Sequence, residues 1–225
     1  MQGYTMRLAV ANTANPDSLA SRMRRQRLSQ FLDLLPSGRV AKVLDVGGTI
    51  AYWNNALGGS YNGLEITVVN LNEETSPSDA PIRTLYGDAR DLRRFGNSEF
   101  DYCFSNSVIE HVGTLGDQFK MANEVRRVAR GYFIQTPYRY FPIEPHFHFP
   151  GWAQLPLPVR TVLHRRLNLG WLKAAPDYLQ AKIDVEQIRL LSVREFQLLF
   201  PDAEIRREKF RGLTKSLMAV RRYPA

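Results

Sequence analysis

The chain alternates between short apolar runs and segments in which apolar residues recur at helical spacing. The apolar runs predict buried strands at residues 40–46, 66–71, 82–86, 101–105 and 132–136. A helical pattern precedes them, between the cap candidates Asp17 and Ser18 and the terminators Pro36 and Gly38. Strands that alternate with helices predict an α/β domain with a mostly parallel sheet.

The clearest helical pattern between two strands lies at residues 116–130. One face should be apolar and buried, and the opposite face basic and solvated. The expected apolar stripe is Phe119, Ala122, Val125 and Val128 or Ala129, and the basic face is Arg126, Arg127 and Arg130.

The pattern changes after Thr136. Residues 138–186 begin with closely spaced prolines and aromatics, which a central strand or a helix interior does not accept. We therefore expect an insertion there. A capped helix at 192–201 and two strands at 203–210 and 214–222 follow, and these strands can pair as an antiparallel hairpin. The expected parts are an N-terminal helical segment (1–38), a ligand-binding core (39–137), the insertion (138–186) and a C-terminal helix and hairpin (187–225) that complete the sheet.

Composition sets the broad class. The 225 residues are 44% hydrophobic and 23% charged, which is typical of a globular domain. Apolar runs stay far below the roughly 20 residues of a membrane span, and the start lacks signal-peptide anatomy, so we expect a cytoplasmic protein. The net charge of +8 is scattered in short groups, which favours solvated helix faces over a nucleic-acid site. Cys103 is the single cysteine, which excludes an internal disulfide, and we expect it to be buried.

The first predicted strand runs into the turn "VLDVGGTIAYW" at 43–53. A dinucleotide turn has the spacing G-x-G-x-x-G, which lets pyrophosphate approach the backbone. Here Gly47 and Gly48 stand alone. The turn therefore fits a nucleoside without phosphates better than a dinucleotide.

Small and polar residues follow each of the first four predicted strands. Ligands of open parallel sheets bind at these carboxyl ends, so the residues there are the binding candidates. They are Asp45, Gly47, Gly48 and Thr49, then Asn70 and Leu71, then Asp88 and Ala89, then Asn106 and Ser107 with Glu110 and His111 close behind.

In order and spacing, five phrases resemble the class I S-adenosylmethionine-dependent methyltransferases, in particular the methyltransferase type 11 group. They are "VLDVGGT", "YGDARDL", "FDYCFSNSVIEHV", "YFIQTP" and "LFPDAEIRREKFRGLTKSLMAV". The resemblance covers roughly residues 40–220. It implies a Rossmann-like doubly wound sheet, mostly parallel, with a C-terminal antiparallel hairpin, and S-adenosylmethionine as cofactor of the 39–137 core.

The resemblance also implies roles for the strand ends. Asp45, Gly47, Gly48 and Thr49 would surround the amino-acid part and ribose of the cofactor, and Asn70, beside Leu71, would meet the ribose hydroxyls. Asp88, with Ala89 nearby, would accept from the adenine amine, and Asn106 and Ser107 would line the methionine end. The ribose position is usually an acid in this family, so we expect Asn70→Asp to preserve or tighten cofactor binding.

Methyl transfer from a sulfonium depends mainly on alignment, and a base is needed only for an acceptor that loses a proton. The candidates are Glu110, His111, Glu144, His146 and His148. If "IEPHFHF" is extended, its glutamate and two histidines project to one side. A metal site of these three, a structural role and a substrate-contacting role are the alternatives. We favour substrate contact, with His146 as base beside His111 and Glu144, and assign no metal ligands.

The insertion is the expected substrate lid, with apolar surface from Trp152 and Trp171 and cations from Arg160, Arg165 and Arg166. The favoured function is methyl transfer to a small-molecule acceptor, such as a hydroxyl of a sugar, lipid-linked intermediate or secondary metabolite. The alternatives are a non-catalytic S-adenosylmethionine-binding or scaffold protein and, ranked lower, an RNA methyltransferase. Peripheral membrane contact through the basic insertion also stays open. Oligomeric state is not indicated by the sequence.

Overall fold

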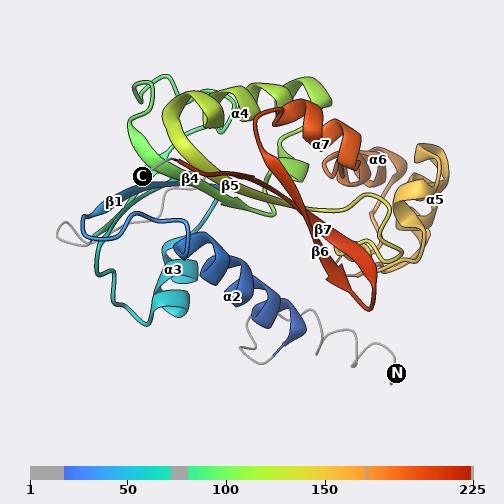
Figure 1. Ribbon diagram of the computed structural model, residues 1–225. Helices are drawn as coiled ribbons and strands as arrows, with labels where there is room; N and C mark the ends of the chain where they lie inside the picture. Colours follow the sequence, from blue (N-terminus) through green and yellow to red (C-terminus); the bar gives the residue numbers. More distant parts are fainter. Residues whose placement is uncertain (1–17, 72–80, 171, 224–225) are drawn as a thin grey trace.

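The computed structural model describes residues 18–71, 81–170 and 172–223. They form one seven-stranded sheet in the order β3-β2-β1-β4-β5-β7-β6 (Figure 1). The strands are β1 (Ala41–Val46), β2 (Leu64–Asn70), β3 (Ile82–Tyr86), β4 (Phe100–Asn106), β5 (Ala129–Pro137), β6 (Glu204–Phe210) and β7 (Leu213–Arg221). The first five pair in parallel, and β7 pairs antiparallel with both β5 and β6. The predicted doubly wound sheet with a C-terminal hairpin is confirmed.

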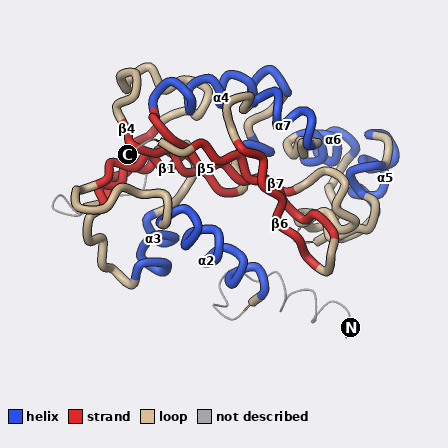
Figure 2. The backbone as a smooth tube through the Cα atoms, viewed as in Figure 1, coloured by secondary structure: helices blue, strands red, loops and turns tan. Residues whose placement is uncertain are grey.

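Helices cover both faces of this sheet (Figures 1 and 2). They are α2 (Leu19–Leu32), α3 (Ile50–Leu57), α4 (Leu115–Val128), α5 (Leu157–Arg166), α6 (Tyr178–Glu186) and α7 (Val193–Leu199), with two 3-10 turns, η1 (Ile109–His111) and η2 (Trp152–Gln154). Helices α2 and α3 lie on one face, and α4 and α7 on the other. Each face buries its own cluster, with Phe31 and Trp53 in the first and Met121 and Phe196 in the second.

Side-chain caps start several helices where the sequence indicates. Ser18 accepts from the backbone N–H of Ser21 at the start of α2. Capping boxes begin α4 and α7, the second through Ser192 and Glu195. Each box satisfies backbone donors that have no partner within the helix, so these polar residues set where the helices begin.

The buried stripe of α4 differs from the predicted one at one position. Phe119 is 50% exposed, whereas Gln118 and Met121 are buried. The Gln118 side-chain amide donates to the carbonyls of Ile109 and Arg189, each at 2.9 Å. These two bonds turn Gln118 toward the protein, so the next residue faces solvent.

The chain leaves the sheet after β5 and returns to it with β6 and β7. Between them, α5 and α6 lie beyond the end of the sheet (Figure 1). This segment has its own apolar cluster, made by Phe147, Trp152, Leu169 and Val185. None of the helices within the described ranges is long and apolar enough to cross a membrane. Cys103 is fully buried in β4, as predicted.

Candidate active site

The turn between β1 and α3 leaves no room for side chains at its two glycines. A Cβ on Gly47, whose φ is +79°, would lie 2.6 Å from the Val108 methyl groups. A Cβ on Gly48 would lie 1.7 Å from a carboxylate oxygen of Asp45. That carboxylate is buried and accepts from the indole N–H of Trp53 at 2.6 Å. Burial raises the pKa of Asp45 to about 7, against the lowering effect of the Trp53 bond.

The residues that flank this turn are tied to it. Thr49 is the N-cap of α3, and its hydroxyl accepts from the backbone N–H of Tyr52 at 3.1 Å. The Asn70 side chain, at the end of β2, donates from Nδ2 to the carbonyl of Gly48 at 2.9 Å. An aspartate could not make this donation, which gives a reason to expect that Asn70→Asp weakens the turn. Leu71, the next residue, is 61% exposed.

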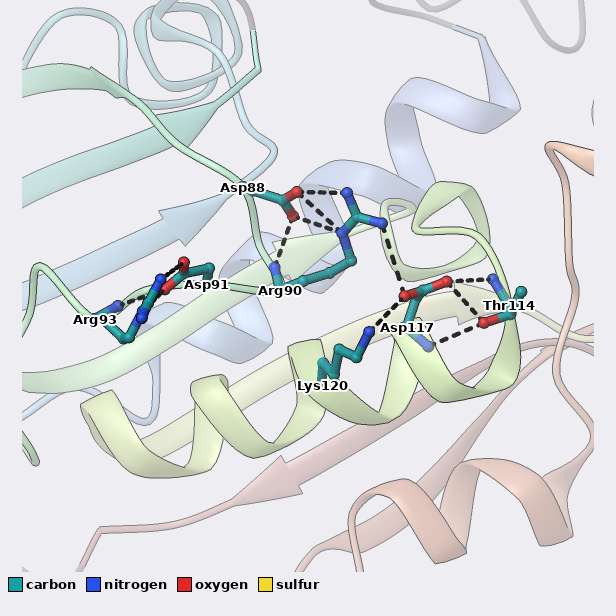
Figure 3. A network of polar contacts seen from close by, with 7 residues as sticks. All are labelled: Asp88, Arg90, Asp91, Arg93, Thr114, Asp117 and Lys120. Atoms are coloured by element: carbon teal, nitrogen blue, oxygen red, sulfur yellow. Dashed lines mark hydrogen bonds and ion pairs between the residues drawn. The ribbon is translucent and has the colours of Figure 1, made fainter.

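At the end of β3, Asp88 begins a chain of ion pairs that reaches α4 (Figure 3). Its carboxylate accepts from the Arg90 guanidinium, at 2.6 Å from the nearest nitrogen. Arg90 also lies 3.7 Å from Asp117, whose side chain caps α4. Hydrogen bonding from Arg90 lowers the pKa of Asp88. Asp88 is therefore a partly exposed carboxylate on a firmly positioned turn.

The end of β4 is joined to the N-terminal helix. Arg27 of α2 donates to the Asn106 side-chain oxygen at 2.7 Å and to Glu208 of β6 at 2.9 Å. Ser107 adopts a positive φ of 59°, and its hydroxyl donates to Gln135 at 2.9 Å. A non-glycine residue in this region turns the chain sharply. Asn106 and Ser107 thus lie beside each other, with both side chains bonded to neighbouring elements.

Beyond this turn, η1 carries a buried glutamate and an exposed histidine. Glu110 is fully buried, and its Oε2 accepts from the Thr136 hydroxyl at 3.0 Å. Its other oxygen, Oε1, is buried without a hydrogen-bond partner among the described residues. Burial raises the pKa of Glu110 to about 7. Desolvation of its ring by the surrounding protein and the neighbouring His146 lower the pKa of His111 to about 4, although part of the residue stays accessible to solvent.

The phrase "IEPHFHF" forms a turn and not the extended strand considered from the sequence. The His148 N–H donates to the Glu144 carbonyl at 2.9 Å, and the buried Glu144 carboxylate accepts from the N–H groups of His146 and Phe147. The turn directs Phe147 into the insertion core. Backbone N–H groups near a carboxylate favour this turn, which sequence alternation alone does not reveal.

This turn brings His146 to His111. Nδ1 of His146 lies 2.5 Å from Glu144 Oε1, and its Nε2 lies 3.1 Å from His111 Nε2. The two rings meet edge to face. Desolvation opposes protonation of His146, but its hydrogen bond to Glu144 and the charges of Glu144 and Glu110 outweigh it and raise the pKa. The fold thus assembles His111, Glu144 and His146, and adds Glu110.

Comparison with known proteins identifies similarity in the strand and helix region of the chain. The family model described as a methyltransferase domain matches residues 44–134, from β1 into β5. These residues are therefore similar to the methyltransferase domains of that family. This family comprises S-adenosylmethionine-dependent enzymes, and S-adenosylmethionine is its cofactor.

Curated proteins also match part of this chain. An uncharacterized protein of Mycobacterium tuberculosis, in strains H37Rv and CDC 1551, is 28% identical over an alignment of 162 residues that covers 64% of this chain and 52% of the relative. The chain therefore spans about half the length of the curated relatives it matches.

Two solved structures share the fold. The CurJ carbon methyltransferase is 13% identical with a TM-score of 0.55, over 96% of this chain and 58% of that one. Phosphoethanolamine N-methyltransferase 2 of Haemonchus contortus, in complex with S-adenosyl-L-methionine, is 16% identical with a TM-score of 0.51, over 81% of this chain and 38% of that one.

Within the matched residues 44–134, the predicted binding residues fall at four adjacent strand ends, since β3, β2, β1 and β4 are neighbours in the sheet. Their side chains differ in direction. Asp45 is turned inward and Thr49 caps a helix, whereas Asn70, Asp88 and Leu71 are at least partly exposed. The sequence did not indicate Arg27 as the partner of Asn106, because the two lie 79 positions apart.

A cavity of about 230 Å³ lies between the insertion and residues 188–190, which follow it. Glu144 lines it, so it adjoins the histidine pair. The Arg160 side chain also lines it, and its Nε is buried without a hydrogen-bond partner within the described part of the chain. The other lining residues are Arg139, Phe147, Trp152, Ala153, Ile188, Arg189 and Leu190.

Proposed function

We propose that this chain transfers a methyl group from S-adenosylmethionine to a hydroxyl of a small acceptor. The observation that carries the proposal is the placement of polar groups at four adjacent strand ends around a close-packed glycine turn, with a histidine pair directly beyond the fourth end. Open parallel sheets bind ligands at this edge. The family match supports S-adenosylmethionine as the ligand.

The residues at the strand ends fit a nucleoside without phosphates. Asn70 and Asp88 lie at neighbouring ends, since the Gly87 N–H donates to the Asn70 carbonyl at 3.0 Å. The Asn70 amide can bond ribose hydroxyls, and the Asp88 carboxylate can accept from an adenine amine. The exposed Leu71, and Ala89 next to Asp88, supply apolar surface. Gly47, Gly48, Asp45 and Thr49 shape the turn, and Asn106 and Ser107 border the methionine end.

When bound, the cofactor supplies a methyl group on a good leaving group, so the protein mainly has to orient the acceptor. We assign this task to His111 and His146, whose Nε2 atoms face each other at the end of β4. Val108 places them near the glycine turn, because it packs on Gly47 one turn before His111. Glu144 is a positioning residue that holds the His146 ring through Nδ1. The pair binds the acceptor hydroxyl and assists loss of its proton.

The cavity beside Glu144 is the proposed acceptor site. Phe147, Trp152 and Leu190 offer apolar surface, and Arg139 and Arg160 offer positive charge. This lining suits an acceptor with an apolar part and an anionic group, such as an acidic sugar, a lipid-linked intermediate or a secondary metabolite. The insertion would then serve as the substrate lid.

Calorimetry with the product S-adenosylhomocysteine tests the cofactor site. We expect wild-type protein to bind it, and Asp88→Ala to weaken binding about 10-fold, the effect of losing one hydrogen bond to a charged group. Asp91→Ala is the matched control, because Asp91 pairs with Arg93 in the same turn as Asp88 pairs with Arg90 (Figure 3). It should bind like wild type.

Absence of binding to wild-type protein would refute the proposal. Turnover is measured as transfer of a labelled methyl group to a set of acidic hydroxyl acceptors. Binding of S-adenosylhomocysteine without transfer to any of them would instead support a non-catalytic S-adenosylmethionine-binding protein.

A further inference from the structure

The side chains at the end of β4 form a cluster with the composition of a metal site. One ligand atom from each of Glu110, His111 and His146 lies within 4.8 Å of the other two. Two imidazoles and one carboxylate suit divalent transition metals. The three residues come from two segments, η1 and the turn after β5, so the fold and not the local sequence brings them together.

We propose that Glu110, His111 and His146 bind one divalent transition-metal ion, with coordination positions left open to the acceptor hydroxyl. The spacing of the histidines fits a shared ion. Two nitrogens about 2.05 Å from one ion, at tetrahedral or octahedral angles, lie about 2.9–3.4 Å apart. The observed separation between the two Nε2 atoms is 3.1 Å.

Glu110 supplies an independent indication. Its carboxylate is fully buried, and Oε1 has no hydrogen-bond partner among residues 18–71, 81–170 and 172–223. A buried polar atom without a partner is costly, and native structures rarely keep one without cause. A cation at the cluster would compensate both this oxygen and the buried charge, while the Thr136 hydroxyl keeps Oε2 in place.

Glu144 supports the cluster by bonding the His146 nitrogen that faces away from it. Its carboxylate lies 2.5 Å from His146 Nδ1 and is itself held by two backbone N–H groups. A proton on Nδ1 leaves the Nε2 lone pair directed toward His111 and Glu110. A carboxylate that orients a histidine in this way is the usual support of a metal ligand.

The role of the ion in the reaction rests on the proposed function, but its binding does not. With the ion bound, the histidine pair acts on the acceptor hydroxyl through the ion and not by direct contact. A hydroxyl bound to a divalent ion loses its proton more readily. The proton is released to the solvent that reaches the exposed His111, and the oxygen forms a bond to the methyl carbon as the carbon–sulfur bond breaks. The products are a methyl ether and S-adenosylhomocysteine.

Calorimetric titration of chelator-stripped protein with Zn²⁺ tests the site, and Co²⁺ absorption reports its coordination. We expect one ion per chain. Glu110→Gln, His111→Gln and His146→Gln should each lower the affinity about 10-fold or more. His148→Gln is the matched control and should bind as tightly as wild type, because His148 lies in the same turn but outside the cluster.

Lack of stoichiometric binding by wild-type protein would overturn the proposal, as would unchanged affinity in the three ligand variants. If Glu110→Gln does not fold, His111→Gln decides, since His111 is exposed. The measurement uses the metal alone. A chain that binds Zn²⁺ but not S-adenosylhomocysteine would refute the proposed function and keep the metal site, and the reverse result would keep the function and refute the site.

Discussion

Asn70 shows how one side-chain atom decides what a residue can do. Its Nδ2 donates to the Gly48 carbonyl, so the amide stabilises the turn that it borders. Family resemblance predicts that an acid would serve at this position. The structure adds that a carboxylate would place an acceptor oxygen beside another acceptor, the carbonyl oxygen, at about the same 2.9 Å.

We therefore expect Asn70→Asp to lower the free energy of unfolding by about 1 kcal/mol, the net contribution of one hydrogen bond at this partly exposed position. It should also weaken S-adenosylhomocysteine binding. Urea unfolding and calorimetry measure the two effects. Asn54→Asp is the control, because the Asn54 oxygen only accepts from the Tyr61 hydroxyl and an aspartate keeps that acceptor. Tighter binding by Asn70→Asp would restore the expectation drawn from the sequence.

At the scale of elements, the β1–α3 turn is a packing junction. Val108 from the end of β4 presses on Gly47, and Asp45 from β1 presses on Gly48. The α3 helix also contacts Asp45, since the indole N–H of Trp53 donates to the Asp45 carboxylate. These two glycines are thus explained by close approach of protein atoms, without any demand from a phosphate.

Gly48→Ala should destabilise the protein by about 1–3 kcal/mol, because its Cβ would displace the buried Asp45 carboxylate. Thermal unfolding measures the loss, and calorimetry should show weaker S-adenosylhomocysteine binding. Gly116→Ala in α4 is the matched control. Its Cβ would lie 3.6 Å from the Thr114 hydroxyl, an ordinary contact, and alanine favours a helix. A Gly48→Ala variant as stable as Gly116→Ala would contradict this view of the turn.

For the whole molecule, the sheet has a core on each face and the insertion has a third. Trp152 stacks on Phe147 with ring centroids 4.3 Å apart, and the Phe147 N–H donates to Glu144. The insertion core therefore supports the turn that carries His146. Loss of this core should therefore disturb the position of His146 relative to His111, while the strands β1 to β4 keep their packing.

Trp152→Ala removes the largest side chain of the third core, and we expect a local cost of about 3–5 kcal/mol. Hydrogen exchange should become faster across residues 144–186 and stay unchanged in β1 and β4. Methyl transfer should fall further than S-adenosylhomocysteine affinity. Val159→Ala in α5 is the control, since Val159 is 43% exposed. Equal acceleration throughout the chain would show that the insertion does not form a separate packing unit.

The sequence by itself determined the strands and the helices α2, α4 and α7, but it did not indicate α5 and α6 of the insertion. Strand runs, helix caps and the hairpin are local patterns, in which burial and backbone hydrogen bonding act over a few neighbouring residues. It also placed the binding candidates at strand ends, because parallel topology brings those ends to one edge. The exact face of α4 escaped it, since the Gln118 bonds to Ile109 and Arg189 depend on contacts far along the chain.

Only the tertiary structure decided which polar groups meet. His146 is 35 positions from His111. The Glu144 carboxylate accepts from the backbone N–H groups of His146 and Phe147, so the chain turns there instead of extending. Burial, which leaves Glu110 Oε1 without a partner in the described part of the chain, is likewise a property of the packed molecule. Periodicity reports the side chain that faces a core, whereas the chemistry of this site depends on distances between segments that only folding sets.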